Sequence, residues 1–96
     1  MWPVKFMPIY DFSPEKNQQL LKERGISFEM VIAAIYEGKL LDTIKHPNET
    51  KYPNQRVYLV DIDHYVYVVP FVKKSEAEVF LKTIFQSRKL TKKYFP

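Results

Sequence analysis

Two adjacent apolar segments constrain this chain more than any other feature of its sequence. They run from Gln55 to Ile62 and from Tyr65 to Val72, and β-branched and aromatic residues dominate both. Only Asp63 and His64 separate them, which predicts a tight β-hairpin. Because apolar residues follow one another with little alternation, both faces of the hairpin are expected to be buried. The sequence therefore predicts two central strands of a sheet that is covered on both sides.

Two helices are predicted ahead of this hairpin. The triplet Ser13-Pro14-Glu15 is a typical helix start, with a serine N-cap, a proline at the first position and an acid in the first turn. This helix is expected to reach Arg24, with Leu20 and Leu21 as its apolar anchors, and Gly25 ends it. Ser27 can cap a second helix that ends at Gly38. Its apolar residues recur at the helical spacing i, i+3, i+4, i+7 and i+8, namely Phe28, Val31, Ile32, Ile35 and Tyr36.

The remaining segments predict the outer strands. Val4 to Phe12 contains Pro8, which cannot donate to a strand ladder, so it is expected to form an edge strand or only the second half of one. Leu40 to His46 predicts a short strand, and a closing strand is expected to begin at Val79. Pro70 predicts a bulge or the end of pairing in the second hairpin strand.

The predicted fold is α+β, with the element order β-α-α-β-β-β-β-α. Two N-terminal helices pack on a mostly antiparallel sheet, and a short helix ends the chain. The 96 residues are expected to form a single domain, 1–96, with one modest core.

Composition excludes several classes of protein. The chain has no cysteine, so it has neither disulfides nor a thiolate metal site. The first twelve residues lack the long apolar run of a signal peptide, and no segment approaches the length of a membrane helix. No glycine-rich phosphate loop, nucleophile elbow or metal-ligand cluster is present. We therefore expect a cytoplasmic protein without cofactor, metal or membrane association.

The positive charge is concentrated in the closing stretch, Val79 to Phe95. From Lys82 onward the chain has five cationic side chains and no carboxylate, whereas residues 1–81 hold ten cations and eleven carboxylates. The net charge of +4 therefore arises at one end of the sequence. A local cluster of this kind is what a phosphate backbone would encounter, which makes this stretch the first place to look for function.

Four phrases of the sequence resemble the BrnT family of toxins. They are Asp11–Asn17 (DFSPEKN), Glu23–Glu29 (ERGISFE), Asn54–Arg56 (NQR) and Ser87–Tyr94 (SRKLTKKY), in the order in which the family has them. The resemblance extends from Ile9 to Tyr94. Two positions depart from it, because the family has Lys-His where this chain has Glu23-Arg24, and Ser-Ala-Arg where this chain has Gln86-Ser87-Arg88.

The resemblance implies the toxin of a type II toxin–antitoxin system, with a compact fold similar to the RelE ribonucleases. It implies an endoribonuclease that stops translation by cutting free or ribosome-bound RNA. It also implies a small DNA-binding antitoxin and a higher-order toxin–antitoxin complex. Two alternatives remain open: a non-catalytic module of the same fold that binds RNA or protein, and a toxin that inhibits another target such as gyrase.

Metal-independent RNA cleavage needs a base for the 2′-hydroxyl, cations for the phosphorus centre and an acid for the leaving 5′-oxygen. Arginine suits the middle role because its planar fork stays charged and meets two phosphate oxygens. Arg88 is the first catalytic candidate, Arg56 the second and Lys82 the third. An adjoining strand is expected to bring Arg56 to the face that carries Arg88. The plainer interpretations are a solvated basic end, a surface ion pair and an exposed strand lysine, respectively.

The residues assigned to RNA or antitoxin binding are Lys89, Lys92, Lys93, Arg24 and Tyr94. Tyr94 either donates a proton near Arg88 or covers the core. The two histidines, His46 and His64, favour loop and turn roles over catalysis. The tyrosines of the central segments either stack bases or pack across strands; they are Tyr52, Tyr58, Tyr65 and Tyr67.

Overall fold

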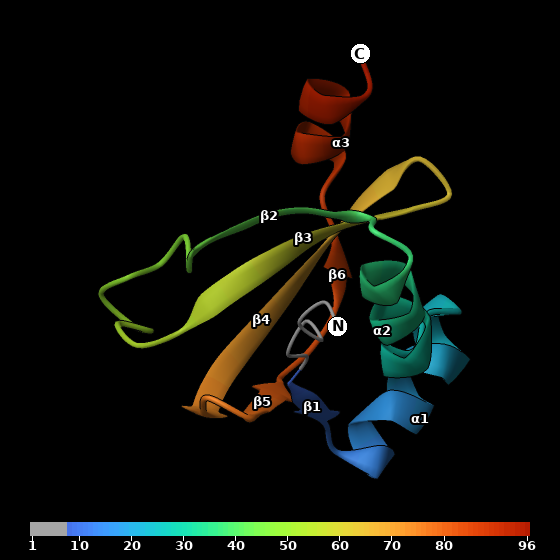
Figure 1. Cartoon of the computed structure of the whole chain (residues 1–96). Coiled ribbons are helices and arrows are strands. Elements are labelled where there is room, and N and C mark those ends of the chain that lie inside the picture. Colours follow the sequence, from blue (N-terminus) through green and yellow to red (C-terminus); the bar gives the residue numbers. More distant parts are fainter. Residues whose placement is uncertain (1–7) are drawn as a thin grey trace, which may run out of the picture.

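A six-stranded sheet carries two helices on one face and a third helix on the other (Figure 1). The computed structural model describes residues 8–96. In chain order the elements are β1 (Ile9–Asp11), α1 (Pro14–Arg24), α2 (Phe28–Tyr36), β2 (Leu40–Lys45), β3 (Arg56–Ile62), β4 (Tyr65–Ser75), β5 (Glu78–Leu81), β6 (Phe85–Gln86) and α3 (Arg88–Tyr94). The α+β class and the helical pair are confirmed.

The strands lie in the order β1-β5-β4-β3-β2, and β6 pairs separately with β4. Among the strand pairs of residues 8–96, β1 and β5 are parallel and the others are antiparallel. The predicted hairpin is confirmed as β3 and β4, and its two turn residues, Asp63 and His64, both have positive φ, at 54° and 61°. Asp61 Oδ1 accepts a hydrogen bond of 2.9 Å from the His64 backbone N–H, which steadies this turn. The first strand is confirmed as an edge strand; residues 4–7 of that prediction lie outside the described residues.

Pro70 does not end the second hairpin strand, but the interruption of pairing predicted there is found on one of its two edges. Strand β4 continues to Ser75, and its pairing with β3 runs through Val57 opposite Pro70; the irregularity lies between Lys73 and Ser75. The opposite edge of β4 is the one that is interrupted. There β4 pairs with β5 from Phe71 onward and with β6 at Tyr67 and Val68, and Pro70 lies between the two pairings. The missing N–H of Pro70 therefore falls where the neighbouring strand is already broken.

The closing strand is consequently two strands with an irregular link, 82–84, and not the single strand that alternation suggested. The Lys82 backbone N–H donates to the Pro70 carbonyl at 2.8 Å, and Ile84 in the link is fully buried. These two contacts keep the link beside the same edge of β4 until β6 begins.

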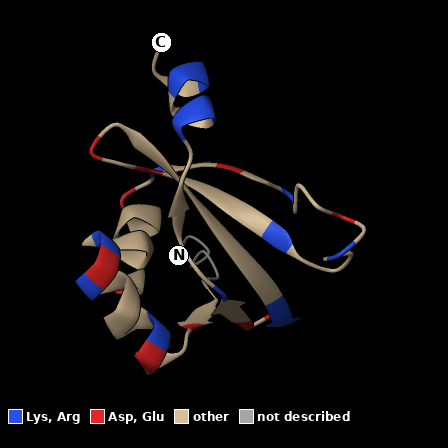
Figure 2. Cartoon of the chain, turned by 180° about the vertical axis from the view of Figure 1, so that it is seen from behind, with Lys and Arg blue, Asp and Glu red and all other residues tan. Residues whose placement is uncertain are grey.

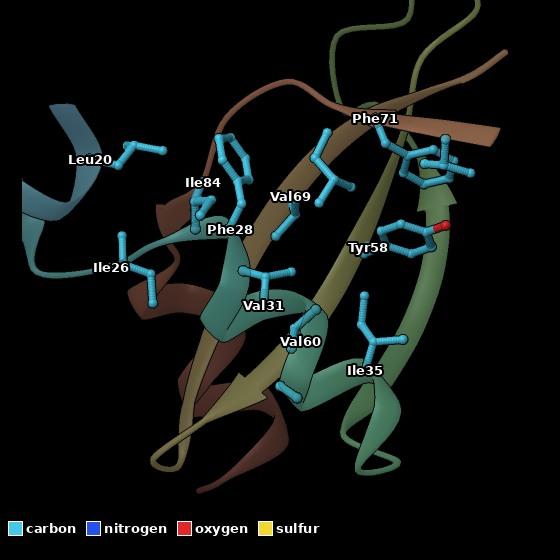
Figure 3. Close-up of a cluster of buried hydrophobic side chains, with 13 residues drawn as sticks. Leu20, Ile26, Phe28, Val31, Ile35, Tyr58, Val60, Val69, Phe71 and Ile84 are labelled. Atoms are coloured by element: carbon cyan, nitrogen blue, oxygen red, sulfur yellow. The ribbon is translucent and has the colours of Figure 1, made fainter. Parts of the chain in front are cut away.

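Two cores lie on opposite faces of the sheet. On the α1–α2 face, side chains of α2 pack on alternate residues of β3 and β4 (Figure 3). Members of this first cluster include Phe28, Val31, Ile35, Tyr58, Val60, Val69 and Phe71. On the α3 face, Val57, Leu59, Val66 and Val68 form a second cluster under Leu90, Tyr94 and Phe95. The prediction that both faces of the hairpin are covered is confirmed.

The helix caps follow the sequence, whereas one predicted anchor does not. Ser13 and Ser27 accept hydrogen bonds from the backbone N–H groups of Lys16 and Met30, and Gly25 ends α1 in the left-handed conformation with φ 68°. Leu20 is 1 % exposed, as expected of an anchor. Leu21 is 48 % exposed, so its predicted anchoring role is wrong.

Asn17 joins the two helices in place of that second anchor. It is 7 % exposed; its Oδ1 accepts from the Phe28 backbone N–H at 2.7 Å and its Nδ2 donates to Glu29 Oε1 at 2.8 Å. One amide side chain thus satisfies a buried donor at the beginning of α2 and fixes the angle between the helices.

Replacement of Asn17 is expected to destabilise the protein. Asn17→Ala leaves the Phe28 N–H without a partner, which costs about 1–3 kcal/mol of unfolding free energy. Urea denaturation followed by circular dichroism measures this loss. Gln18→Ala, at an exposed neighbouring position of α1, is the matched control and should unfold like the wild type. Equal stability of the two variants would contradict the proposed link.

The same contact predicts a dependence on pH. The hydrogen bond from Asn17 is the main cause that lowers the pKa of Glu29 below its ordinary value. A carboxyl with a depressed folded-state pKa stabilises the fold above its unfolded pKa and loses that contribution as pH falls through the folded value. NMR titration should therefore show the Glu29 pKa rising in Asn17→Ala, and an unchanged pKa would contradict this assignment.

Candidate functional site

The C-terminal end of α1 and the segment that leads into β6 form one groove. Arg24 Nη1 donates to the Ile84 carbonyl at 2.8 Å, a contact between residues 60 positions apart. The groove has a volume of about 460 Å³. Its lining residues are Glu23, Arg24, Ile26, Tyr67, Ile84, Phe85 and Gln86.

Local structure places these side chains at the groove. Gly25 turns the chain out of α1, so that Arg24 stands in the last exposed turn while Ile26 returns to the core at 2 % exposure. Ile84 is fully buried, which fixes the carbonyl that Arg24 binds. On the sheet, Gln86 lies opposite Tyr67, and its Nε2 donates to the Tyr67 hydroxyl at 3.0 Å.

The groove holds complementary chemical groups. Glu23 is an exposed carboxylate that accepts a 3.4 Å hydrogen bond from Gln19 Nε2. Arg24 uses one of its five guanidinium N–H donors for Ile84 and keeps the others for a ligand. The Tyr67 hydroxyl accepts from Gln86, which leaves its proton to donate. A proton acceptor, a fixed cation and a proton donor therefore line one groove.

Arg88 lies immediately after this groove, at the first position of α3. The N-cap of α3 is Ser87, whose side chain accepts from the Leu90 N–H at 3.1 Å. Arg88, Lys89, Lys92 and Lys93 are all exposed, and Figure 2 shows blue on α3 without red. The two ion pairs among the described residues are Lys45–Glu49 and Lys73–Glu76, so the predicted cations Lys82, Arg88, Lys89, Lys92 and Lys93 have no carboxylate partner there.

Lys82 occupies a second groove, on the α3 face of the sheet. Its Nζ lies 5.6 Å from the centre of the Phe80 ring, and the groove also includes Gln55 and Pro70. Phe85 lines this groove as well as the one at α1, so the two grooves are adjacent. Arg24 therefore binds Ile84, Lys82 lies in the adjacent groove, and Arg88 follows this segment as the first residue of α3 without lining either groove.

Arg56 does not join this group, so the prediction that it shares a face with Arg88 is wrong. It alternates with Val57, whose side chain lies under α3, and therefore projects on the opposite face with Tyr58. It is also opposite Phe71 on β4, whereas the α3 cap binds Val66, five residues away and about 17 Å along the strand. Arg56 instead lines a separate groove of about 500 Å³ with Lys73 and Tyr58.

Tyr58, which lines that separate groove, packs in the core. Tyr58 is 8 % exposed and stacks on Phe71 with ring centroids 4.0 Å apart. Burial is the main cause that raises the pKa values of Tyr58 and Tyr10, which lie 6.2 Å apart between ring centroids. Both phenols therefore stay neutral near physiological pH, and cross-strand packing is the role the structure gives to Tyr58.

Tyr94 covers the core beneath α3, which is the second of the two roles expected for it. His64 lies in the hairpin turn, edge-on to Phe95 with ring centroids 5.0 Å apart, and His46 lies in the loop after β2, with its ring centroid 4.4 Å from that of Tyr52. Neither histidine lines the groove at Arg24.

Comparison with known proteins gave no match: no family model, curated protein or solved structure is significantly similar to this chain. Among residues 8–96, no helix is long and apolar enough to cross a membrane. No group of three or more His, Asp or Glu side chains in this part of the chain is arranged to hold a metal ion.

Sequence reasoning missed Glu23, Tyr67 and Gln86 as members of one site. In the sequence, Glu23 and Gln86 stand out only as departures from the BrnT pattern, and Tyr67 is one of several tyrosines in predicted strands. The contact between Arg24 and Ile84 joins distant positions, so no periodicity or spacing reveals it. The resemblance was the one guide to it, because Arg24 lies within the phrase Glu23–Glu29 and Ile84 lies three residues before the phrase Ser87–Tyr94.

Thr91 attaches α3 to the sheet, and its replacement is expected to loosen that helix. Its Oγ1 accepts from the fully buried Val66 N–H at 2.9 Å and its hydroxyl donates to the Ser87 carbonyl at 2.7 Å. Thr91→Val keeps the shape but removes both bonds, with an expected loss of about 1–3 kcal/mol. Chemical denaturation and faster hydrogen exchange at Val66 measure it. Thr43→Val, on the exposed strand β2, is the control that should change neither quantity.

Proposed function

We propose that this protein is a BrnT-like toxin that cleaves RNA without a metal ion, in the groove between α1 and β6. The observation that carries the proposal is the hydrogen bond from Arg24 to Ile84, because it joins the matched phrase Glu23–Glu29 to the segment that leads into the matched phrase Ser87–Tyr94. One phrase contains Glu23 and Arg24; the other begins at Ser87, directly after Gln86. Glu23 and Arg24 of the first phrase thus line one groove with Gln86, the residue that precedes the second phrase. A RelE-like fold, with its helical pair between the first two strands, is part of this proposal.

The proposed reaction uses three groups of this chain. The Glu23 carboxylate takes the proton of the 2′-hydroxyl, and the resulting oxygen attacks the adjacent phosphorus. Arg24 and Arg88 hold the non-bridging oxygens as negative charge develops on them. Tyr67 gives its proton to the departing 5′-oxygen and regains one from water, while Glu23 releases its proton to water. The products are a 2′,3′-cyclic phosphate and a 5′-hydroxyl.

This assignment gives the departures from the family a chemical meaning. Arg24 stands where the family has histidine, and an arginine does not act as a base because it keeps its proton in proteins. The neighbouring Glu23 supplies a proton acceptor from the same turn of α1. In this proposal Arg24 therefore binds the phosphate, and the general base is the preceding residue, Glu23.

The proposed partner is a small acidic, DNA-binding antitoxin. The unpaired cations of α3 would be neutralised by its carboxylates, because opposite charges across an interface speed association and select the partner. The second edge of β6 has no paired strand among the described residues, which would allow an antitoxin segment to add there. The product of an adjacent gene should therefore co-purify with the protein.

The central test measures RNA cleavage by the purified protein and growth arrest on its expression without a partner. Arg24→Ala is expected to slow cleavage about 10²–10³-fold, as does loss of one preorganised donor to a developing oxyanion. Glu23→Gln is expected to cost about 10²–10⁴-fold, the contribution of a general base. Tyr67→Phe and Arg88→Ala should also slow cleavage and relieve growth arrest.

Arg56→Ala is the matched control, because Arg56 is an exposed arginine in a different groove. Its cleavage rate and toxicity should equal those of the wild type. Intact RNA after long incubation with the wild-type protein, together with salt-sensitive RNA binding, would reject the ribonuclease and favour the non-catalytic binding module.

A further inference from the structure

The groove on the α3 face carries charge and aromatic rings that the proposed reaction does not use. Its volume is about 430 Å³. Its lining residues are Lys16, His46, Tyr52, Gln55, Pro70, Lys82, Thr83 and Phe85, with no carboxylate among them. Any ligand of this groove therefore meets positive charge and hydrogen-bond donors.

The aromatic side chains differ in how far they are already occupied. The Tyr52 ring packs against His46 and also lies 5.4 Å from Lys51 Nζ. Phe80 lies between Lys74 and Lys82, at 5.3 and 5.6 Å from their ammonium groups. Phe85 is 39 % exposed and takes part in no ring or cation contact of this kind among the described residues. Phe85 is therefore the ring with a free face.

Phe85 also occupies the boundary between the two grooves. It projects on the α3 face because its register partner on β4 is Val68, a member of the second core cluster. The next residue, Gln86, projects on the other face beside Tyr67. A strand of nucleic acid that leaves the groove at Arg24 past Phe85 would therefore enter the second groove, which also contains Lys82.

We infer that this second groove binds the nucleotides of a single-stranded RNA that flank the cleaved bond. The inference rests on the proposed function for the identity of the ligand. One unstacked base packs on Phe85, and the phosphate next to it lies between Lys82 and Lys16. Stacking on an exposed ring requires an unpaired base, which is why a single strand and not a duplex is expected. Phe85 and Lys82 are positioning residues in this scheme.

Binding is tested apart from cleavage with a fluorescein-labelled 12-nucleotide RNA in which every ribose is 2′-O-methylated and therefore cannot be cut. Fluorescence anisotropy should show binding about 5- to 100-fold weaker for Phe85→Ala, the usual effect of losing one stacked base. Phe85→Leu keeps an apolar side chain for packing but has no ring face, so it should weaken binding by a similar factor. Lys82→Gln should lower the slope of log K against log salt by about 0.7, the value of one phosphate contact on a single strand.

Two control variants lie outside both grooves. Tyr36→Ala removes an aromatic ring that is 58 % exposed on α2, and Lys39→Gln removes an exposed lysine after that helix. Both should bind the probe as the wild type does. A duplex of the same sequence should bind more weakly and without dependence on Phe85.

The outcomes separate this inference from the proposed function. Wild-type protein that binds the probe through Phe85 and Lys82 but leaves unmodified RNA intact would reject the ribonuclease and support the inference. Cleavage that depends on Arg24, with probe binding unaffected in Phe85→Leu and Lys82→Gln, would overturn the inference alone. Binding of poly-glutamate that depends on Lys82, with no such dependence for the RNA probe, would assign the groove to an acidic protein and also overturn it.

Discussion

Strand β4 is the constraint on which the rest of this structure depends, because its two edges are used differently. One edge pairs continuously with β3, and the other is divided between β5 and β6. Pro70 lies at the division, where it accepts the Lys82 N–H through its carbonyl and has no N–H of its own to offer. Regular pairing with β4 therefore stops after β5 and resumes at β6. The chain that follows this interruption, Ile84 to Gln86, shares a groove with Glu23 and Arg24 at the end of α1.

The candidate site depends on this interruption between β5 and β6 and on one arginine, Arg24. The buried side chain of Ile84 orients its carbonyl, and the guanidinium of Arg24 satisfies it. A buried carbonyl without a donor would cost free energy, so this hydrogen bond stabilises the fold and also fixes the guanidinium at the groove. The other N–H groups of the same planar fork are the ones that the proposed function assigns to a phosphate.

Local chemistry predicts much of this fold. The serine caps, the left-handed Gly25 and the Asp63-His64 turn each depend on residues within four positions of one another, and all were anticipated. The apolar continuity of β3 and β4 likewise indicated cover on both faces. The predictions that were wrong depend on contacts between residues far apart in the sequence. Leu21 is exposed because Asn17 joins the helices instead, and the closing strand divides because the edge of β4 is interrupted.

The candidate site was harder to predict for the same reason. The strand pattern places Arg56 with Tyr58, but only the structure shows that the helical pair covers that face and that α3 covers the other. The cations of the closing stretch were visible from composition, whereas the carboxylate, tyrosine and glutamine that accompany Arg24 come from separate elements. The charge of a segment can be counted from its sequence. The relative positions of an acid, a base and a cation depend on how the whole chain packs.

The distribution of charge gives a physical reason to regard the closing stretch as a binding surface. Four cations stand on a helix of seven residues with no carboxylate partner in the described chain, and like charges at this spacing oppose helix formation. The helix persists because Leu90, Tyr94 and Phe95 cover the second core cluster and because Thr91 and Ser87 hold its first turn to β4. Packing therefore offsets a repulsion that a few acidic residues would remove. A polyanion bound to this surface would relieve that repulsion and stabilise the folded state, since a ligand that binds only the folded chain shifts the equilibrium toward it.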